Sequence, residues 1–391
     1  MFIAVMGQNI ARGWLARDLT GTNAGLGGVM LGFGLPMMLA VPWGGVAADR
    51  FPKRTVLMCS VVILAVTSTW IGLAVTFDFM AYWMLVVAAG LQAIAFALYM
   101  PSRMAFITEL VERDMLSNAI ALGQMGAEGA RVIGPALAGI LIASATFGTQ
   151  AVFFVSTGLS IIGLVTLIGM PPGYPRSTRP VLSPLTELRD GLRYVRAYPV
   201  VRLLVLTSLG VVVTGFPYMA FLPALADDAF EVGSAGYGVM STVNAAGAVG
   251  AGFFVARGAA HRDPWRLMTI SGLLFAGGVV ALSVAPTYPF ALLALAAIGG
   301  MSLAFQTSNQ ALLFSLAQFD FHGRIQGLVM LGFSGFGIAA LPLGLVADAV
   351  GLRPTLAAMG LSGIVVMLVF MAKARTLRTD EVLAPPAGVV A

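Results

Sequence analysis

The sequence predicts an all-α integral membrane protein with twelve transmembrane helices in two six-helix bundles. Of its 391 residues, 59% are hydrophobic and only 10% are charged, and the mean hydropathy is +0.92. A soluble domain carries about 25% charged residues, so most of the surface of this chain suits lipid better than water. At about 20 apolar residues per span, the length accommodates twelve helices with short connections. This composition excludes a soluble enzyme.

Twelve apolar runs, separated by Gly, Pro and charged residues, predict the spans. They lie at about residues 1–19, 24–47, 55–77, 80–106, 116–146, 150–171, 200–225, 235–257, 266–286, 288–316, 325–349 and 353–372. The longest polar segment is rich in Pro and Arg and separates the two sets of six. We therefore expect an N-terminal bundle (1–171), a cytoplasmic linker (172–199), a C-terminal bundle (200–372) and a cytoplasmic tail (373–391).

The charges predict the orientation in the plasma (inner) membrane. Of the 22 Lys and Arg residues, all except Arg12, Arg17, Arg131 and Arg353 fall in segments on one side of the predicted spans. The opposite loops carry acids: Asp78, Asp227, Asp228, Glu231 and Asp348. Positive charge marks the cytoplasmic side, so both termini are expected there. The net charge of +5 then reflects topology and not nucleic-acid binding.

The residue types also limit partners and cofactors. One cysteine and two histidines, Cys59, His261 and His322, cannot form a disulfide framework or a Cys-rich metal site. We expect no metal and no cofactor, a proton gradient as the energy source, and a monomer that contacts lipid and a small-molecule substrate. Arg12 interrupts the first apolar stretch, and no basic segment precedes that stretch, so a cleaved signal peptide is not expected.

The two halves resemble each other in sequence. Residues 15–18 (LARD) recur in part as residues 225–228 (LADD), and residues 28–30 (GVM) recur as residues 238–240, both 210 positions later. The near-constant offset predicts a parallel 6+6 repeat with a binding site between bundles. The seventh span begins near Val200, so its counterpart would begin about ten residues before Met1. We therefore expect the first helix to lack its cytoplasmic end.

The segment GGVAADRFPKR after the second span resembles the signature loop of the major facilitator superfamily, G-x-x-x-D-R-x-G-R-R. The residues of this loop are Gly45, Asp49, Arg50, Lys53 and Arg54, with Pro52 in place of the usual Gly. An Asp here can meet the positive amino end of a facing helix, while its basic neighbours pair with Glu109 or Glu112. Such a lock would favour one access state. The alternative is that these cations only set the topology.

Longer stretches narrow the resemblance to one branch of that superfamily. GWLARDLTGTNAGLGGVMLGFGLP and GRIQGLVMLGFSGFGIAALPLGLVADAVGLRP are similar to the enterobactin-exporter and macrolide-efflux branch. This resemblance implies a proton-driven exporter of small, often amphipathic molecules. The branch often has an acidic residue in the first helix, near the position that Val5 occupies here.

The segment RVIGPALAG in the fifth predicted span resembles the antiporter motif of export-type facilitators, G-P-x-x-G-G. Gly134, Pro135 and Gly139 match, and Ala138 replaces the first of the paired glycines. Proline kinks a helix and small residues allow close helix packing. The resemblance implies antiporter-specific packing, and a generic kink is the alternative.

Amide side chains within the predicted spans are candidates for the substrate cavity. They are Gln8, Asn9, Gln92, Gln124, Asn244, Gln306, Asn309 and Gln310. Such groups are unfavourable in lipid unless they face water or a partner, so hydrogen bonds between helices are the alternative for each of them. The last three have the i, i+3, i+4 spacing of one helical face, which favours a cavity wall.

Glu128, Arg131 and Arg12 are the candidates for proton coupling. Glu128 and Arg131 lie about ten to fifteen residues into the fifth span, near mid-membrane, on one helical face. A carboxylate whose proton affinity changes as a cavity opens can load and release protons, with Arg131 or Arg12 tuning it. The alternative is a static ion pair that orders the bundle.

The leading hypothesis is therefore proton-coupled export of a small amphipathic molecule of the drug, macrolide or siderophore type. The alternatives are an uncoupled facilitator or uptake carrier, or a non-transporting membrane protein with an incomplete first helix. Residue types do not distinguish among the substrates.

Overall fold

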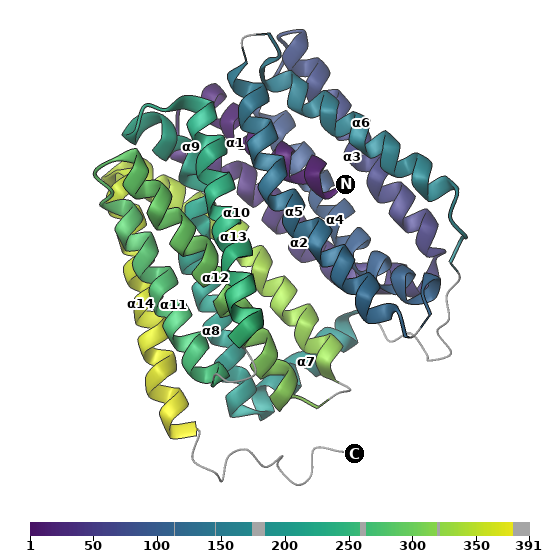
Figure 1. Ribbon diagram of the computed structural model, residues 1–391, viewed down its shortest axis with the longest axis vertical. Coiled ribbons are helices and arrows are strands. Elements are labelled where there is room, and N and C mark those ends of the chain that lie inside the picture. The colour runs from purple at the N-terminus through teal and green to yellow at the C-terminus, as the bar shows by residue number, and fades with distance from the viewer. Residues whose placement is uncertain (113, 145, 174–183, 259–262, 319–320, 378–391) are drawn as a thin grey trace.

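The computed structural model describes residues 1–112, 114–144, 146–173, 184–258, 263–318 and 321–377. Within these ranges every regular element is a helix (Figure 1). In the N-terminal half the helices are α1 (Phe2–Thr20), α2 (Asn23–Arg50), α3 (Lys53–Thr76), α4 (Tyr82–Leu110), α5 (Leu116–Ala143) and α6 (Gly148–Ile168). After α7 (Pro184–Ala197) come α8 (Pro199–Gly215), η1 (Phe216–Phe221), α9 (Leu222–Ala224), η2 (Leu225–Ala229), α10 (Gly233–Gly258), α11 (Pro264–Ser283), α12 (Tyr288–Leu316), α13 (His322–Val350) and α14 (Leu352–Leu377).

The long helices lie where apolar runs predict spans. Ten segments among the described residues are long and apolar enough to cross a membrane: α2 to α6, the continuous segment Pro199–Ala229, and α11 to α14. Helices α1 and α10 occupy the first and eighth places in this order. Helix α1 carries three charged residues, Arg12, Arg17 and Asp18, within 19 residues. The count of twelve spans stays a prediction.

Large apolar side chains cover the outside of the helices. Leu39 is 63% exposed, Val66 61%, Ile140 69% and Leu293 73%. Water-exposed apolar surface on this scale is rare for a soluble monomer, whereas hydrocarbon chains solvate it without loss. The surface therefore agrees with the composition in placing these helices in a bilayer.

The helices form two groups whose largest mutual contacts are along two helix pairs. Helices α1 to α6 pack on one another, as do α8 to α14, while α2 packs against α13 and α5 against α10 (Figure 1). If α8 to η2 are counted as one span, each contact joins the second span of one group to the fifth span of the other. The two contacts are therefore equivalent under exchange of the groups, as expected for a repeated architecture.

The seventh predicted span, at 200–225, coincides with the continuous apolar segment Pro199–Ala229, but the helix type changes along it. It is divided into α8, a 3₁₀ segment η1, one α-turn and a π-helical segment η2. Pro217 and Pro223 cannot donate the backbone hydrogen bonds of a regular α-helix, which accounts for the change in helix type. The π-helical segment ends in the acidic pair Asp227 and Asp228.

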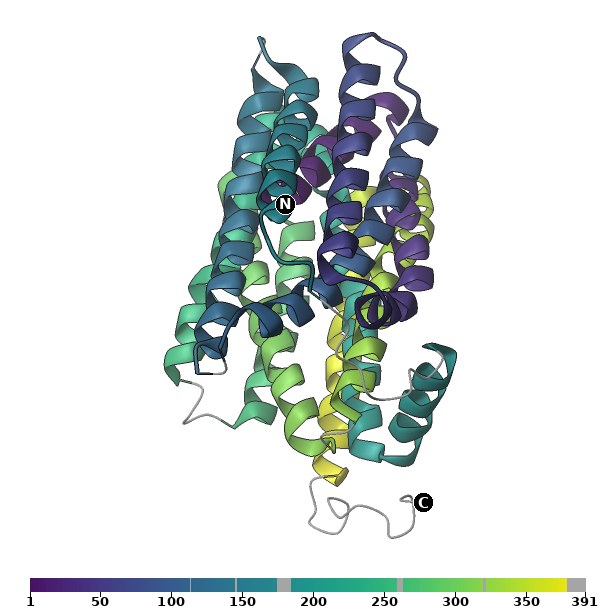
Figure 2. The same ribbon diagram turned by 90° about the vertical axis from the view of Figure 1, so that its right-hand side faces the viewer.

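The linker contains a helix that the sequence analysis did not predict. Helix α7 packs against α13, α8 and α2 and lies at the edge of the molecule (Figure 2). The part of the linker at 174–183 and the tail beyond Leu377 lie outside the described residues. We call the end of the molecule near α7 the linker end. The opposite end, where α1 ends at Thr20 and α13 ends at Val350, is called the latch end, after the polar contacts between the two groups that are described below.

Candidate functional site

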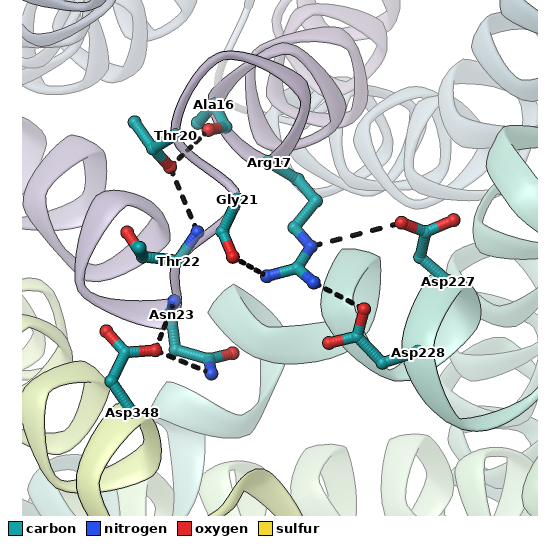
Figure 3. A network of polar contacts seen from close by, with 9 residues as sticks. All are labelled: Ala16, Arg17, Thr20, Gly21, Thr22, Asn23, Asp227, Asp228 and Asp348. Atoms are coloured by element: carbon teal, nitrogen blue, oxygen red, sulfur yellow. Dashed lines mark hydrogen bonds and ion pairs between the residues drawn. The ribbon is translucent and has the colours of Figure 1, made fainter.

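Polar contacts join the two helix groups at the latch end. Arg17, near the end of α1, donates to the Asp228 carboxylate through Nη2 and lies 4.0 Å from Asp227 through Nε (Figure 3). Its Nη1 donates to the carbonyl of Gly21 at 2.6 Å, which orients the guanidinium. The Asp227 and Asp228 side chains are about half exposed, at 48% and 43%. Exposed ion pairs contribute about 0–1 kcal/mol, so this one adds little to the stability of the contact between the groups.

Asp348, in the last turn of α13, caps the amino end of α2 (Figure 3). Its Oδ1 accepts from the backbone N–H of Asn23 at 2.8 Å and from Asn23 Nδ2 at 2.9 Å, and its Oδ2 accepts from the N–H of Ala24 at 2.9 Å. The first N–H groups of a helix have no partner within the helix and carry partial positive charge. A carboxylate from one group thus caps a helix of the other.

Glycines bring the helix backbones together beneath these contacts. A Cβ on Gly34 of α2 would lie 2.9 Å from the Cα of Gly337 of α13, and a Cβ on Gly139 of α5 would lie 2.8 Å from the Cα of Gly238 of α10. Toward the linker end, Gly129 of α5 and Gly250 of α10 meet nothing within 4 Å. Helices α5 and α10 are therefore in backbone contact at the latch end, whereas Gly129 and Gly250 make no such contact.

A hollow of about 510 Å³ opens at the latch end. Arg17, Asn23, Asp228, Asp348 and Arg353 are among the residues that line it. The ion pair and the α2 cap therefore face a space that water can enter. We refer to Arg17, Asn23, Asp227, Asp228 and Asp348 together as the latch.

The signature loop lies at the linker end, away from the latch. Lys53 is buried and its Nζ lies 2.6 Å from the carboxylate of Glu109, a partner expected from the sequence. Arg54 donates to the carbonyl of Met170 at 2.9 Å, so both cations bind within the N-terminal group. Asp49 and Arg50 are exposed. Asp49 is thus free to meet a facing helix in another arrangement of the two groups.

The polar residues of α1 form a buried network with α3 and α4. Arg12 donates to Asn9 Oδ1 at 2.6 Å and to Gln92 Oε1, and its Nε donates to the carbonyl of Gln8 at 3.4 Å. Gln8 Nε2 donates to Ser68 Oγ at 2.6 Å. Among the described residues no carboxylate pairs with Arg12. Gln8, Asn9 and Gln92 thus hold a buried cation between helices.

Glu128 and Arg131 form a loose ion pair on α5. Arg131 Nε lies 3.8 Å from Glu128 Oε1, and the side chains are 54% and 33% exposed for Arg131 and Glu128. Glu128 Oε2 is buried and has no hydrogen-bond donor among the residues that the structure describes. The carboxylate thus has one oxygen near a cation and the other without a donor. Arg12 binds the amides named above instead.

The amides of the C-terminal group occupy different environments. Asn244 donates to the Tyr218 hydroxyl at 2.7 Å and to the carbonyl of Leu295 at 3.2 Å, which joins helices. Gln306 is partly buried and donates to the carbonyl of Ser302, four residues earlier, at 3.3 Å.

The remaining candidate amides lie on α12 and α5. Asn309 is buried, and its Oδ1 has no donor within the described ranges. Gln310 is exposed and lies 3.4 Å from Gln326 Oε1, and Gln124 is exposed on α5. The spacing of Gln306, Asn309 and Gln310 on one helix therefore does not give the three side chains one common environment.

The antiporter-like motif contacts both neighbours of α5. Gly134 packs against α1, where an added Cβ would lie 2.6 Å from Met6 Cβ. Pro135 lies inside the helix, and its carbonyl faces Gly238 of α10. Together with the contact of Gly139, the motif places α5 against its own group and against the other group. In the described ranges no three His, Cys, Asp or Glu side chains lie close enough to hold a metal ion.

Reasoning from the sequence missed the latch. The acids were interpreted only as markers of the outer loops, and Arg17 only as a charge within a span. A signal was present in the repeat, because Arg17 and Asp227 are 210 positions apart and occupy equivalent places in LARD and LADD. Equivalent residues near a two-fold axis face each other, and a change of sign at one of them creates an ion pair.

A family model described as transmembrane secretion effector matches residues 3–385. The chain belongs to this family of the major facilitator superfamily. The chain is therefore a membrane transporter and not an enzyme. The described helices agree with this assignment, because solved transporters of the superfamily share the fold.

The relatives and solved structures are distant. The chain is 24% identical to the staphyloferrin A transporter of Staphylococcus aureus over 86% of this chain and 84% of that protein. It is 24% identical to the putative multidrug resistance protein MdtD of Klebsiella pneumoniae over 39% of this chain and 31% of that protein. A bacterial homologue of the human lysosomal transporter Spinster, in an inward-facing and occupied conformation, aligns with a TM-score of 0.76 at 15% identity, over 96% of this chain and 94% of that one. A POT family transporter in complex with a peptide conjugate aligns with a TM-score of 0.75 at 12% identity, over 96% of this chain and 95% of that one.

We predict that Gly139→Ala opens the latch end. The added Cβ meets the backbone of α10, which cannot move as a side chain can, and overpacking of this kind costs about 1–3 kcal/mol. The population with a closed latch end should fall at least about fivefold. Spin labels at Thr146→Cys and Thr287→Cys, exposed at the latch end of the two groups, report the separation in a Cys59→Ser background. Gly129→Ala on the same helix meets open space and is the control; equal distance distributions in all three proteins would contradict the prediction.

We predict that Asp348→Ala also lowers the population with a closed latch end. Loss of an N-cap acceptor costs about 0.5–2 kcal/mol, and here the cost falls only on the arrangement in which α13 meets α2. The same pair of spin labels should show a larger long-distance population. Asp263→Ala removes the side-chain cap of α11 at Trp265, within one group, and is the matched control. A similar shift in both variants would show that capping acts on overall stability and not on the latch.

Proposed function

We propose that the protein exports a small amphipathic molecule across the plasma membrane by alternating access, coupled to proton entry. The observation that carries this proposal is the set of inter-group contacts at one end: the α2 cap, the ion pair and the glycine contacts. These contacts are polar or sterically close, and none is covalent. Rotation of the two groups can therefore break them and form others at the linker end.

The distribution of charge supports the direction of the two ends. Exposed cations such as Arg50, Arg193 and Arg375 lie at the linker end, and the acids of the latch lie at the other. By the positive-inside rule the linker end is cytoplasmic. With the latch closed, the described structure then corresponds to an inward-facing state. In this state Asp49 of the signature loop is exposed, while Lys53 keeps its ion pair with Glu109.

The relatives named as a staphyloferrin A transporter and a putative multidrug resistance protein support a small-molecule substrate. For coupling, Glu128 is the candidate proton carrier, because one of its oxygens is buried without a donor and the other lies near Arg131. A proton on the carboxylate removes its attraction to Arg131, and loss of the proton restores it. Opening of the site to alternate sides would couple this exchange to transport.

We predict that Glu128→Gln abolishes efflux driven by a pH gradient and leaves downhill substrate exchange intact, because the amide keeps the shape of the side chain but cannot titrate. The measurement is efflux from proteoliposomes with and without an imposed gradient. Gln124→Glu, one turn away and exposed, adds an acid elsewhere on the helix; in the Glu128→Gln background it should not rescue coupling. Undiminished gradient-driven efflux in Glu128→Gln would refute the role. Wild-type efflux that ignores the gradient would favour an uncoupled carrier.

We predict that Asp49→Asn slows transport without weakening substrate binding. Asp49 is exposed at the linker end, remote from mid-membrane, and its proposed role is to cap a facing helix in the other access state. Transport rate and substrate affinity are measured on the same purified variant. A large loss of affinity at normal expression would contradict this assignment.

A further inference from the structure

Helix α7 has two chemically different faces. Gly191, Tyr194 and Val195 are buried against the C-terminal group. Arg189, Arg193 and Arg196 are exposed. At 100° per residue these arginines lie within an arc of about 60°. They form one basic stripe, which we call the α7 arginine face.

Contacts on the buried side fix the rotation of α7. The Tyr194 ring stacks between Tyr198 at 4.2 Å and Phe321 at 4.1 Å, measured between ring centroids. The Tyr194 hydroxyl accepts from the backbone N–H of Gln318 at 3.0 Å, and Asp190 lies 3.8 Å from Arg324. Since these contacts hold one side of α7 against α13 and its preceding loop, the arginine face points outward.

The arginine face lies at the level of a membrane surface. The apolar segment Pro199–Ala229 begins three residues after Arg196. Leu192, which lies between Arg189 and Arg193 in the sequence, is 41% exposed. An exposed apolar side chain beside basic ones is typical of a helix that rests on a bilayer with its apolar side chain in the interface. Figure 2 shows α7 at the edge of the molecule, beside the helices and not between them.

We propose that the α7 arginine face binds the headgroups of anionic phospholipids in the leaflet at the linker end. Guanidinium groups form charge-assisted, bidentate hydrogen bonds to phosphate oxygens, and clustered arginines next to a span are attracted to an anionic surface. Helix α7 has two acids: by helical spacing Glu187 falls on the opposite side from the arginines, and Asp190 lies 3.8 Å from Arg324 of α13. This inference does not depend on the direction or coupling of transport.

The test measures lipid binding to the purified full-length protein in detergent by native mass spectrometry. Phosphatidylglycerol is titrated against phosphatidylcholine with the same acyl chains. The wild type should retain phosphatidylglycerol preferentially. Arg189→Gln/Arg193→Gln should weaken that binding by about fivefold for each arginine removed, while Arg189→Lys/Arg193→Lys should retain most of it.

The matched control is Lys373→Gln/Arg375→Gln, which removes two exposed cations from α14 at the same end. A loss specific to the α7 variant supports the proposal. Equal losses in both variants would indicate a diffuse surface charge, and no loss in either would leave the arginines as topology signals only; each result overturns the proposal. Retention of soluble polyglutamate without preferential retention of phosphatidylglycerol would overturn it in favour of an acidic protein partner.

Discussion

The close approach of helix backbones at the latch end is the constraint on which the other contacts depend. In a bilayer, burial of apolar side chains gives helices little reason to associate, since lipid is equally apolar, and packing of small residues becomes decisive. Gly344 lets α13 touch the main chain of α2 at Asn23, Gly34 and Gly337 continue this contact toward mid-helix, and Gly139 and Gly238 do the same for α5 and α10. Only at that separation can Asp348 reach the N–H groups of α2. The polar contacts of the latch can therefore form only because the glycines allow this close approach.

The repeat explains why the contacts occur in equivalent pairs and also where they differ. A two-fold relation joins α2–α13 to α5–α10, yet among the described residues the carboxylate cap is seen at α2–α13 alone, where Asp348 has an apolar counterpart near the end of α5. The ion pair depends on a similar departure. Arg17 and Asp227, 4.0 Å apart, are repeat equivalents of opposite sign, while Asp228, which accepts the hydrogen bond of Arg17, keeps the sign of its equivalent Asp18. The two halves therefore differ at the positions that form the polar contacts of the latch.

Much of the fold follows from local sequence, and much of the site does not. Apolar runs locate the long helices because a span must be apolar whatever surrounds it. The amphipathic α7 was hidden by Pro and Arg in a segment interpreted as linker, although Arg189, Arg193 and Arg196 already had helical spacing. The latch depends on which helix ends meet, which no single segment encodes. The spacing of Glu128 and Arg131 predicted their proximity because both lie on one helix. Gln92, the partner of Arg12 on α4, was found only in the structure, because that contact joins two helices.

The polar side chains inside the two groups differ in charge. In the N-terminal group, Arg12 is buried among neutral oxygens, and Glu128 faces Arg131 on α5. In the C-terminal group, the polar side chains considered above within α10 and α12 are neutral amides, such as Asn244 and Asn309. A buried guanidinium stays charged, so its neutral partners at Gln8, Asn9 and Gln92 must supply oxygens in every state of the cycle. A carboxylate near a permanent cation can alternate between two charges, and an amide cannot. The proposed proton exchange therefore belongs to the N-terminal group, while the C-terminal group offers neutral hydrogen-bonding groups.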